Sequence, residues 1–455
     1  MGDSVCLGAS VQQDSTIKIE TDVMPTTFGH KSRDFTSLLF SRQLNSPLFT
    51  ESQDDAGVRG LLVREATRHD DLNWQLELDD DLLWTNGDGI FANDVLTQMR
   101  SIAASSPFKF LLRPLKQVQV LGPKTLSFKT RLPLDLPAVL SNPVFAPERI
   151  EPQTSTGSFQ VQTLTPRRAV FRPNGDSPAI EFVLADNAED GQRMFDEGIT
   201  SLTCSTTYPI DRWQDTDERA GLHVQPLNIS VDIVLPISMD KKFVGCISAA
   251  IDRDEIARDL HGLVEPLNAA TDMWLDEGSV GRSVGRLSDA PRPPLGRQWL
   301  LVYPDFSPNE QLAYAVATQL KRELGLDLFP FAQTYEDYLQ GQGASNADCF
   351  RLVLRASPWP DPISMILPYL QHSEMDVSMG KKLEQTVRAI AAAGVAERHE
   401  LLREASTIIE GELAIFPIVR LRSITRTRFS HFSSPVSGWT NYLSNLPNCS
   451  RTVPG

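Results

Sequence analysis

The beginning of the chain contains both of the periodicities that distinguish strands from helices. Residues 14–24, 72–78 and 82–90 have strand-like patterns, and the last of these enters a turn rich in glycine and aspartate. Residues 33–50 instead carry apolar side chains at helical spacing. We therefore expect a strand, a helix and two further strands in this part of the chain.

A helix and a series of antiparallel strands are predicted next. Residues 92–102 have helical periodicity, and Asn93 or Asp94 can cap the free N–H groups at the helix start. A turn of glycine, proline and lysine then separates two strand-like runs, which is typical of a β-hairpin. The strands expected here are residues 118–121, 125–132, 159–165 and 169–173.

The second half of the chain alternates strands with longer helices. Residues 244–262 predict one helix that ends at Gly262, and residues 309–325 predict an amphipathic helix closed by Gly325. The strands and the last helix expected around them are 299–303, 326–331, 396–411 and 415–426. A helix between two strands favours a parallel, helix-covered sheet, so the expected class is mixed α/β.

Composition narrows the possible functions. The 455 residues are too many for one ordinary core, and the 41% of hydrophobic residues is typical of a globular protein. The 43 basic and 58 acidic residues give a net charge of -15, which disfavours binding to nucleic acid. A local basic group alternates along one strand and is predicted to form its solvated face: Arg420, Arg422, Arg426 and Arg428.

Targeting signals and cysteines bear on the compartment. No stretch of about 18 apolar residues exists, so we expect no membrane span. No leader-like apolar segment is found at the N-terminus, which favours the cytoplasm, with an exported protein whose leader was removed as the alternative. Cys6 is read as an ordinary residue, with a lipid-anchor cysteine as the other reading. The five cysteines are scattered and odd in number, so no disulfide is expected.

Catalytic and metal-binding signatures are lacking. The seven histidines show no spacing typical of a metal site, and residues 371–374 (Gln-His-Ser-Glu) are read as a solvated loop rather than as ligands. No nucleophile-elbow, dinucleotide or phosphate-loop motif occurs. We therefore predict no metal and no cofactor. A catalytic site assembled from distant segments stays open, because catalytic groups need to be close only in space.

Four segments resemble a known family in order and spacing. Residues 82–102 resemble its strand, turn and helix with the x-A-x-D-V pattern, and residues 155–174 resemble its glycine-containing hairpin block. Residues 245–266 resemble its I-D-R helix, and residues 355–370 its D-x-P-D-P type loop. Together they resemble family 5, the peptide- and nickel-binding branch, of the solute-binding proteins of ABC importers.

The resemblance implies a two-lobed fold similar to periplasmic binding proteins of class II, cluster C, with an extra small domain. The first lobe would comprise residues 1–48, 156–236 and 430–455. The extra subdomain of that lobe would be residues 49–155, and the second lobe residues 237–429. In such a fold the ligand lies in the cleft between lobes, which close by a hinge motion.

The resemblance also suggests where a ligand is held. The position at which peptide-binding members carry an aspartate for the ligand's ammonium group is Pro358 here, which offers no charge. The position of a cleft tryptophan corresponds to Arg355, and the segment beside the peptide corresponds to Arg33-Asp34-Phe35.

Two arginines in this cleft would suit an anionic ligand, because a guanidinium binds carboxylate or phosphate through paired hydrogen bonds. The alternative is that Arg33 and Arg355 lie on the surface or form salt bridges between lobes. Trp359 is placed either to stack on a flat ligand or to pack in the core, and Asp232 is predicted to face the cleft.

Three functions are compatible with these residues. The first is a cytosolic ligand binder or sensor, like the ligand domain of the sugar-phosphate-stress transcription regulators, although no DNA-binding helices precede the fold here. The second is an importer component with an ABC permease as its partner. The third is a biosynthetic enzyme, such as a cyclase, that reuses the fold.

Overall fold

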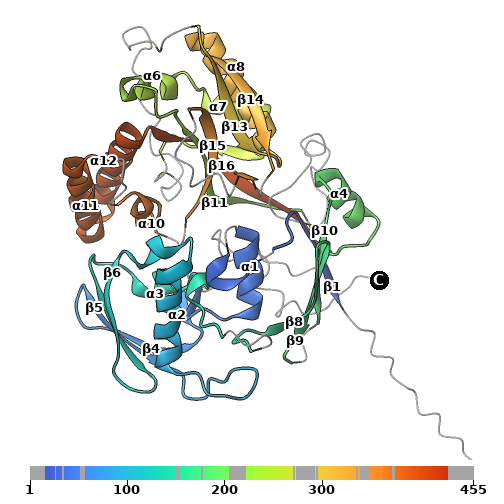
Figure 1. The fold of residues 1–455 in the computed structure, drawn as a ribbon, viewed down its shortest axis with the longest axis vertical. Coiled ribbons are helices and arrows are strands. Elements are labelled where there is room, and N and C mark those ends of the chain that lie inside the picture. The colour runs from blue at the N-terminus through green and yellow to red at the C-terminus, as the bar shows by residue number, and fades with distance from the viewer. Residues whose placement is uncertain are drawn as a thin grey trace, which may run out of the picture.

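The computed structural model describes most of the chain. The described residues are 16–25, 27–32, 35–51, 57–149, 154–175, 178–203, 222–269, 272, 293, 296–334, 337–338, 348–357, 359, 361–370 and 375–428. Within them, no helix has the length and apolar character needed to cross a membrane. The elements gather into two lobes, one around a six-stranded sheet and one around two four-stranded sheets and a two-stranded sheet (Figure 1).

The first lobe is built on a four-stranded sheet in the order β1-β10-β9-β8. Its strands and helices are β1 (Ile17–Thr21), β8 (Phe159–Thr165), β9 (Arg168–Pro173), β10 (Ile180–Leu184), η1 (Gly29–Lys31), α1 (Phe35–Leu44) and α4 (Ala188–Asp196). β1 pairs with β10 in parallel, and the other two pairs are antiparallel. Three buried phenylalanines join α1 to this sheet, with the Phe40 and Phe182 ring centroids 4.0 Å apart and Phe171 packed edge-on.

An extra subdomain extends this lobe. Its elements are β2 (Phe49–Glu51), β3 (Val58–Gly60), β4 (Val63–Arg68), β5 (Asn73–Leu78), α2 (Ala92–Ser105), η2 (Lys109–Leu112), β6 (Leu115–Val120), β7 (Thr125–Thr130), α3 (Leu136–Leu140) and η3 (Pro143–Phe145). The antiparallel sheet has the order β4-β5-β7-β6, and β5 and β7 alternate buried with half-buried residues. This alternation confirms the predicted strand at 72–78 and the predicted hairpin.

The second lobe holds a six-stranded sheet in the order β12-β16-β11-β15-β13-β14. Its strands are β11 (Leu222–Val234), β12 (Val264–Pro266), β13 (Gln298–Pro304), β14 (Asp327–Gln333), β15 (Phe350–Ala356) and β16 (Ile415–Arg426). Its helices are η5 (Lys241–Phe243), α6 (Val244–Ala249), α7 (Arg253–Asp259), α8 (Asn309–Leu324), α10 (Ile363–Ile366), η8 (Leu367–Tyr369), α11 (Val377–Ala392) and α12 (Val395–Leu413). β13 and β14 are parallel with α8 between them, which confirms the predicted strand–helix–strand unit.

The long strands β11 and β16 pair along most of their length and connect the lobes. Just beyond the end of β16, Thr427 pairs with Leu202, which in turn pairs with Ile19 of β1. The ladder of main-chain hydrogen bonds therefore runs from the second-lobe sheet into the first lobe. β11 lies between β15 and β16, so it belongs to the large sheet although its residues fall in the first lobe as predicted from the sequence. The residue boundaries of the lobes stay a prediction.

One predicted helix is wrong in detail. Residues 244–262 form the two short helices α6 and α7 instead of one. Asp252 caps α7 by accepting a hydrogen bond from the Glu255 N–H at 2.8 Å. The Arg253 side chain is buried and donates to the carbonyls of Ser248 and Pro417. A buried cation that needs carbonyl partners from a distant strand fixes the break between these helices.

The arginine-rich face of β16 also differs from the prediction. Arg420, Arg422 and Arg426 are only partly exposed, because partners from other elements engage them, whereas Arg428 is exposed. Arg422 contacts Glu265 at 2.9 Å, and Arg426 contacts Asp196 of α4 at 2.8 Å. Arg420 donates to the Leu227 carbonyl at 2.6 Å, and Arg428 donates to the Phe195 carbonyl at 2.5 Å. The alternating arginines therefore bind β16 to its surroundings, and some of these contacts cross between the lobes.

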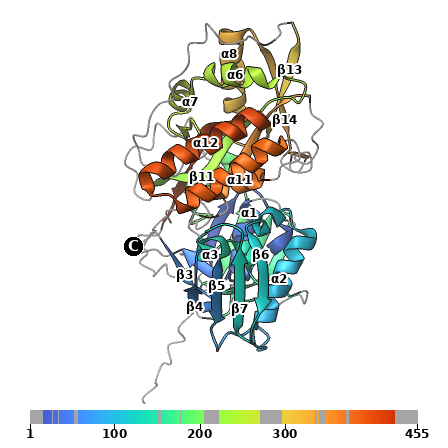
Figure 2. The same ribbon diagram turned by 90° about the vertical axis from the view of Figure 1, so that its left-hand side faces the viewer.

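The second lobe packs against the extra subdomain. One hydrophobic cluster contains Leu76 and Phe128 of the subdomain sheet together with Ile366 and Leu383 of the second lobe. Figure 2 shows α11 and α12 directly over α1, α2 and β6. This shared apolar contact holds the two lobes together in the arrangement seen here.

Gly157, two residues before β8, lies close to the main chain at the end of α1. A Cβ added at Gly157 would lie 2.5 Å from main-chain atoms of Gln43 and Leu44, so Gly157→Ala forces the backbone to move. We expect this change to lower the free energy of unfolding by about 1–3 kcal/mol in urea titrations. Gly175→Ala, where a Cβ meets nothing within 4 Å, serves as the control and should change stability little. Equal stability of the two variants would contradict the close approach.

Candidate functional site

Two of the predicted site residues meet in the core of the second lobe. Asp232 of β11 is 1% exposed, and Arg355 of the neighbouring strand β15 is 11% exposed. Their side chains form an ion pair, and Arg355 Nη1 also donates a hydrogen bond to the hydroxyl of Tyr369. The guanidinium carbon lies 5.0 Å from the centroid of the Tyr369 ring. Adjacent strands and the 3-10 turn η8 thus bring together an acid, a cation and a phenol.

Burial determines the electrostatics of this cluster. Removal from water raises the pKa of Asp232, and the Arg355 charge opposes that rise. Burial lowers the pKa of Arg355, but the combined effect of Asp232, Tyr369 and Glu410 outweighs it, so the net shift is upward. Burial raises the pKa of Tyr369 to about 12, against the opposing effect of Arg355. Tyr369 is therefore a neutral donor and acceptor at physiological pH, and the guanidinium is committed to partners of its own chain.

Little space for a ligand adjoins this cluster. A cavity of about 10 Å³ lies beside Arg355, and Glu410, Ser406 and Met365 also line it. That volume is enough for about one water molecule. The Nε–H of Arg355 has no hydrogen-bond partner among the residues that the structure describes. A ligand can reach this donor only after the surrounding segments move apart.

The other predicted site residues are placed differently. Trp359 is 2% exposed and lies in the hydrophobic cluster that spans the two lobes. Phe35 is the first residue of α1. Arg33, Asp34 and Pro358 lie outside the described residues. The structure therefore brings Asp232 and Arg355 into contact and keeps Trp359 in the core.

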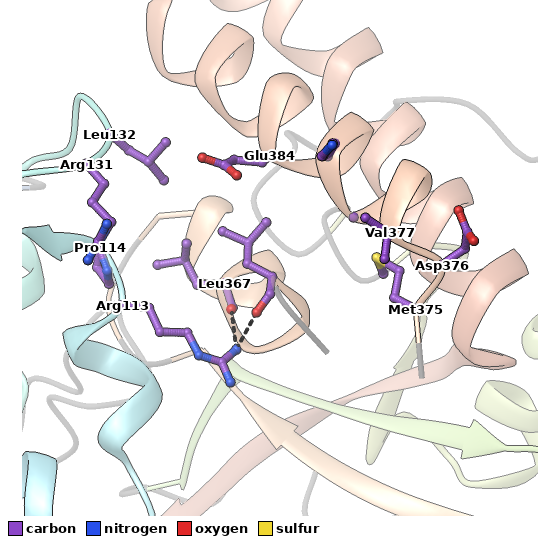
Figure 3. A pocket seen from close by; sticks show the side chains of 12 residues that line it. Arg113, Pro114, Arg131, Leu132, Leu367, Met375, Asp376, Val377 and Glu384 are labelled. Atoms are coloured by element: carbon purple, nitrogen blue, oxygen red, sulfur yellow. Dashed lines mark hydrogen bonds between the residues drawn. The ribbon is translucent and has the colours of Figure 1, made fainter. Parts of the chain in front are cut away.

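A larger cavity, which the sequence did not predict, lies between the extra subdomain and the second lobe. It has a volume of about 260 Å³ and is formed by the segment before β6, the end of β7, η8 and the start of α11 (Figure 3). Arg113 crosses from the subdomain and donates from Nη1 to the carbonyls of Leu367, Pro368 and Leu370. No sequence pattern predicts these contacts, because the partners are 254 to 257 residues apart in the chain.

Comparison with known proteins adds the fold family. No protein-family model and no curated protein matches the sequence. The murein tripeptide binding protein MppA of Escherichia coli matches with a TM-score of 0.79 at 16% identity over 91% of this chain and 94% of MppA. Haemophilus influenzae OppA in complex with the peptide RPPGFSPFR gives 0.82 at 15% identity, covering 96% and 98% of the chains. Staphylococcus aureus NikA with Ni(L-His)2 gives 0.71 at 14% identity, covering 94% and 99%.

This chain therefore has the fold of the family 5 solute-binding proteins, which confirms the predicted α/β, two-lobed class. The unliganded open form of MppA also matches, with a TM-score of 0.63 at 15% identity.

The ion pair between Asp232 and Arg355 makes a prediction about stability. Arg355→Ala leaves a buried carboxylate without its cation, and we expect a loss of about 3–5 kcal/mol in the free energy of unfolding. Replacing both residues by leucine should cost much less than the sum of the single changes, because no uncompensated charge remains. Urea unfolding of the unaltered chain, Asp232→Leu, Arg355→Leu and the double leucine variant measures this coupling.

The matched control is Arg388→Ala. Arg388 pairs with Glu384 at 2.9 Å on the exposed side of α11, so its removal should change stability little. Additive single changes at Asp232 and Arg355 would show that their ion pair does not contribute to the fold.

Proposed function

We propose that this chain binds a small molecule, anionic or peptide-like, between its two lobes. The observation that carries this proposal is the match over nearly the whole length of both chains to OppA holding a peptide, with a TM-score of 0.82. A fold of two lobes that share long strands is suited to enclose a ligand, because the lobes can close around it without unfolding. The burial of Trp359 and the packing of α10 against the subdomain support a closed arrangement of this kind.

The proposed ligand class follows from the absence of an acidic side chain at position 358 in the loop formed by residues 355–362. Pro358 stands where peptide-binding members of the fold carry the acidic anchor for an ammonium group, and proline supplies no charge. The next acid in the loop, Asp361, is held by Arg398 at 2.8 Å and accepts from the Ile363 N–H at 2.7 Å. Its carboxylate thus organises the loop and is already engaged. A ligand with a free α-ammonium therefore has no evident counter-charge in the described part of the loop.

From the sequence, Arg355 is expected to be free to bind an anionic ligand, but the structure pairs it with Asp232. Its guanidinium is paired with Asp232, so an anionic ligand competes with a carboxylate of the protein for the same donors. The Nε–H without a partner is the donor that remains for a ligand or a water. We therefore propose that Arg355, with its partner Asp232, approaches the ligand at the base of the cleft when the surrounding segments move apart, while Trp359 stays packed in the core. Arg33, Asp34 and Phe35 would contact the ligand from the first lobe.

Two biological roles follow from this binding activity. One is a cytosolic ligand binder or sensor, and the other is the binding component of an ABC importer that works with a permease. Two proteins with this fold are periplasmic, the oligopeptide-binding protein OppAIV of Borrelia burgdorferi and MppA. Fractionation of native cells separates the two roles, because an importer component faces outward from the cytoplasmic membrane.

Restoring an acid at position 358 tests the proposed ligand class. We expect the unaltered chain to bind di- to pentapeptides weakly or not at all, and Pro358→Asp to bind a free-amine tripeptide at least tenfold more tightly. The reason is that a charge-assisted hydrogen bond to the ammonium contributes about 1.5–3 kcal/mol. Isothermal titration calorimetry measures both affinities.

Two controls make this experiment specific. The N-acetylated tripeptide lacks the ammonium and should gain nothing in Pro358→Asp, and Pro360→Asp places the same charge two residues further along the loop. Micromolar binding of the free-amine tripeptide to the unaltered chain would contradict the proposal. Equal gains for the acetylated peptide would show that position 358 does not contact the ligand's amine.

A further inference from the structure

The larger cavity carries positive charges that have no carboxylate partner among the described residues. Arg113, Arg131 and Lys381 line it, and none of them has a carboxylate partner in the described part of the chain. Arg113 uses only Nη1 for its three carbonyl contacts, so Nη2 and Nε are left without protein partners there. Burial lowers the pKa of Arg113, which is the effect of removing a cation from water without compensation by an anion.

The two acids at this cavity already have partners. Glu384 is paired with Arg388 one helical turn further along α11 at 2.9 Å. Asp376 caps the start of α11, where its carboxylate accepts from the Ser378 N–H at 2.8 Å. Figure 3 shows Glu384 and Asp376 on the α11 side and Arg113 and Arg131 on the subdomain side. With Glu384 paired to Arg388, three cations and the carboxylate of Asp376 remain at the cavity, so its net charge is positive.

The rest of the wall is apolar. Leu132, Leu367, Leu370 and Met375 are each no more than 8% exposed in the folded chain, yet they border the cavity. Gly380 of α11 contributes main chain to this wall, and a Cβ built there would meet only the sulfur of Met375, at 3.8 Å. A glycine inside a helix costs stability relative to alanine, and here it leaves room at the cavity.

We propose that this cavity is a second ligand site, distinct from the cleft near Arg355, and that it takes a small carboxylate with an apolar body. The apolar body fits among the leucines and the methionine, where its burial is favourable. The carboxylate accepts hydrogen bonds from the free Nη2 and Nε of Arg113, with Arg131 and Lys381 adding attraction at longer range. This assignment uses the three cations that line the cavity and does not depend on the identity of the cleft ligand.

Octanoate is the probe for this site, and octan-1-ol is its uncharged counterpart. We expect calorimetry on the full chain to show octanoate binding at least tenfold more tightly than octanol, because a charge-assisted contact to a half-buried guanidinium is lost in the alcohol. Equal affinity of the two, or no heat with octanoate at millimolar concentration, would overturn the proposal.

Variants on α11 locate the site without disturbing the fold. Lys381→Gln should weaken octanoate binding about two- to fivefold. Lys382→Gln is the matched control, because its neighbour Glu404 lies 2.9 Å away and the residue does not line the cavity. Gly380→Leu places a side chain in the cavity and should abolish octanoate binding, while raising the melting temperature because leucine favours a helix more than glycine does.

Two outcomes would place the binding elsewhere. Unchanged octanoate affinity in Gly380→Leu would show that the fatty acid occupies the main cleft or the surface. Equal losses in Lys381→Gln and Lys382→Gln would show a general charge effect and no defined site. Either result overturns the proposal, and neither bears on the tripeptide experiment at position 358.

Discussion

The pairing of β11 with β16 is the constraint on which the rest of the molecule depends. Ten residue pairs from Leu222 and Arg426 to Val234 and Ile415 place the two strands side by side in the large sheet. The ladder then passes through Thr427 and Leu202 to Ile19. A one-residue shift in the register of this pairing would move every side chain of the shifted strand to the other face of the sheet. The two lobes are therefore fixed in register at this connection, and relative motion is left to the segments around it.

Arginine side chains supply several of the polar contacts that join distant segments. Arg253 reaches the Pro417 carbonyl, Arg426 reaches Asp196, and Arg113 reaches the carbonyls of η8. A guanidinium has five N–H donors in a rigid plane, so one residue can satisfy several carbonyls at once. The chain has a net charge of -15, yet these cations form contacts within the protein. The overall charge does not predict these internal contacts.

The sequence pattern predicted correctly those elements that depend on interactions within short segments. The β13–α8–β14 unit and its closing Gly325 were predicted because helical and strand periodicities and a left-handed glycine are properties of short segments. The break between α6 and α7 was missed, because it depends on Arg253 and a carbonyl 164 residues away. The ion pair of Asp232 with Arg355 was missed for the same reason. Each residue was singled out alone, and only strand order makes them neighbours.

Arg113 takes part in two structural features at once, and this has a thermodynamic consequence. Its hydrogen bonds to η8 exist only while the lobes are together, and the same guanidinium borders the larger cavity. A molecule that binds there only in the closed arrangement shifts the balance between open and closed forms by about 2.7 kcal/mol at a concentration of one hundred times its Kd. By reciprocity, whatever closes the lobes raises affinity at the cavity by the same factor. A ligand of the proposed cavity site and a ligand of the proposed cleft would therefore be coupled through Arg113.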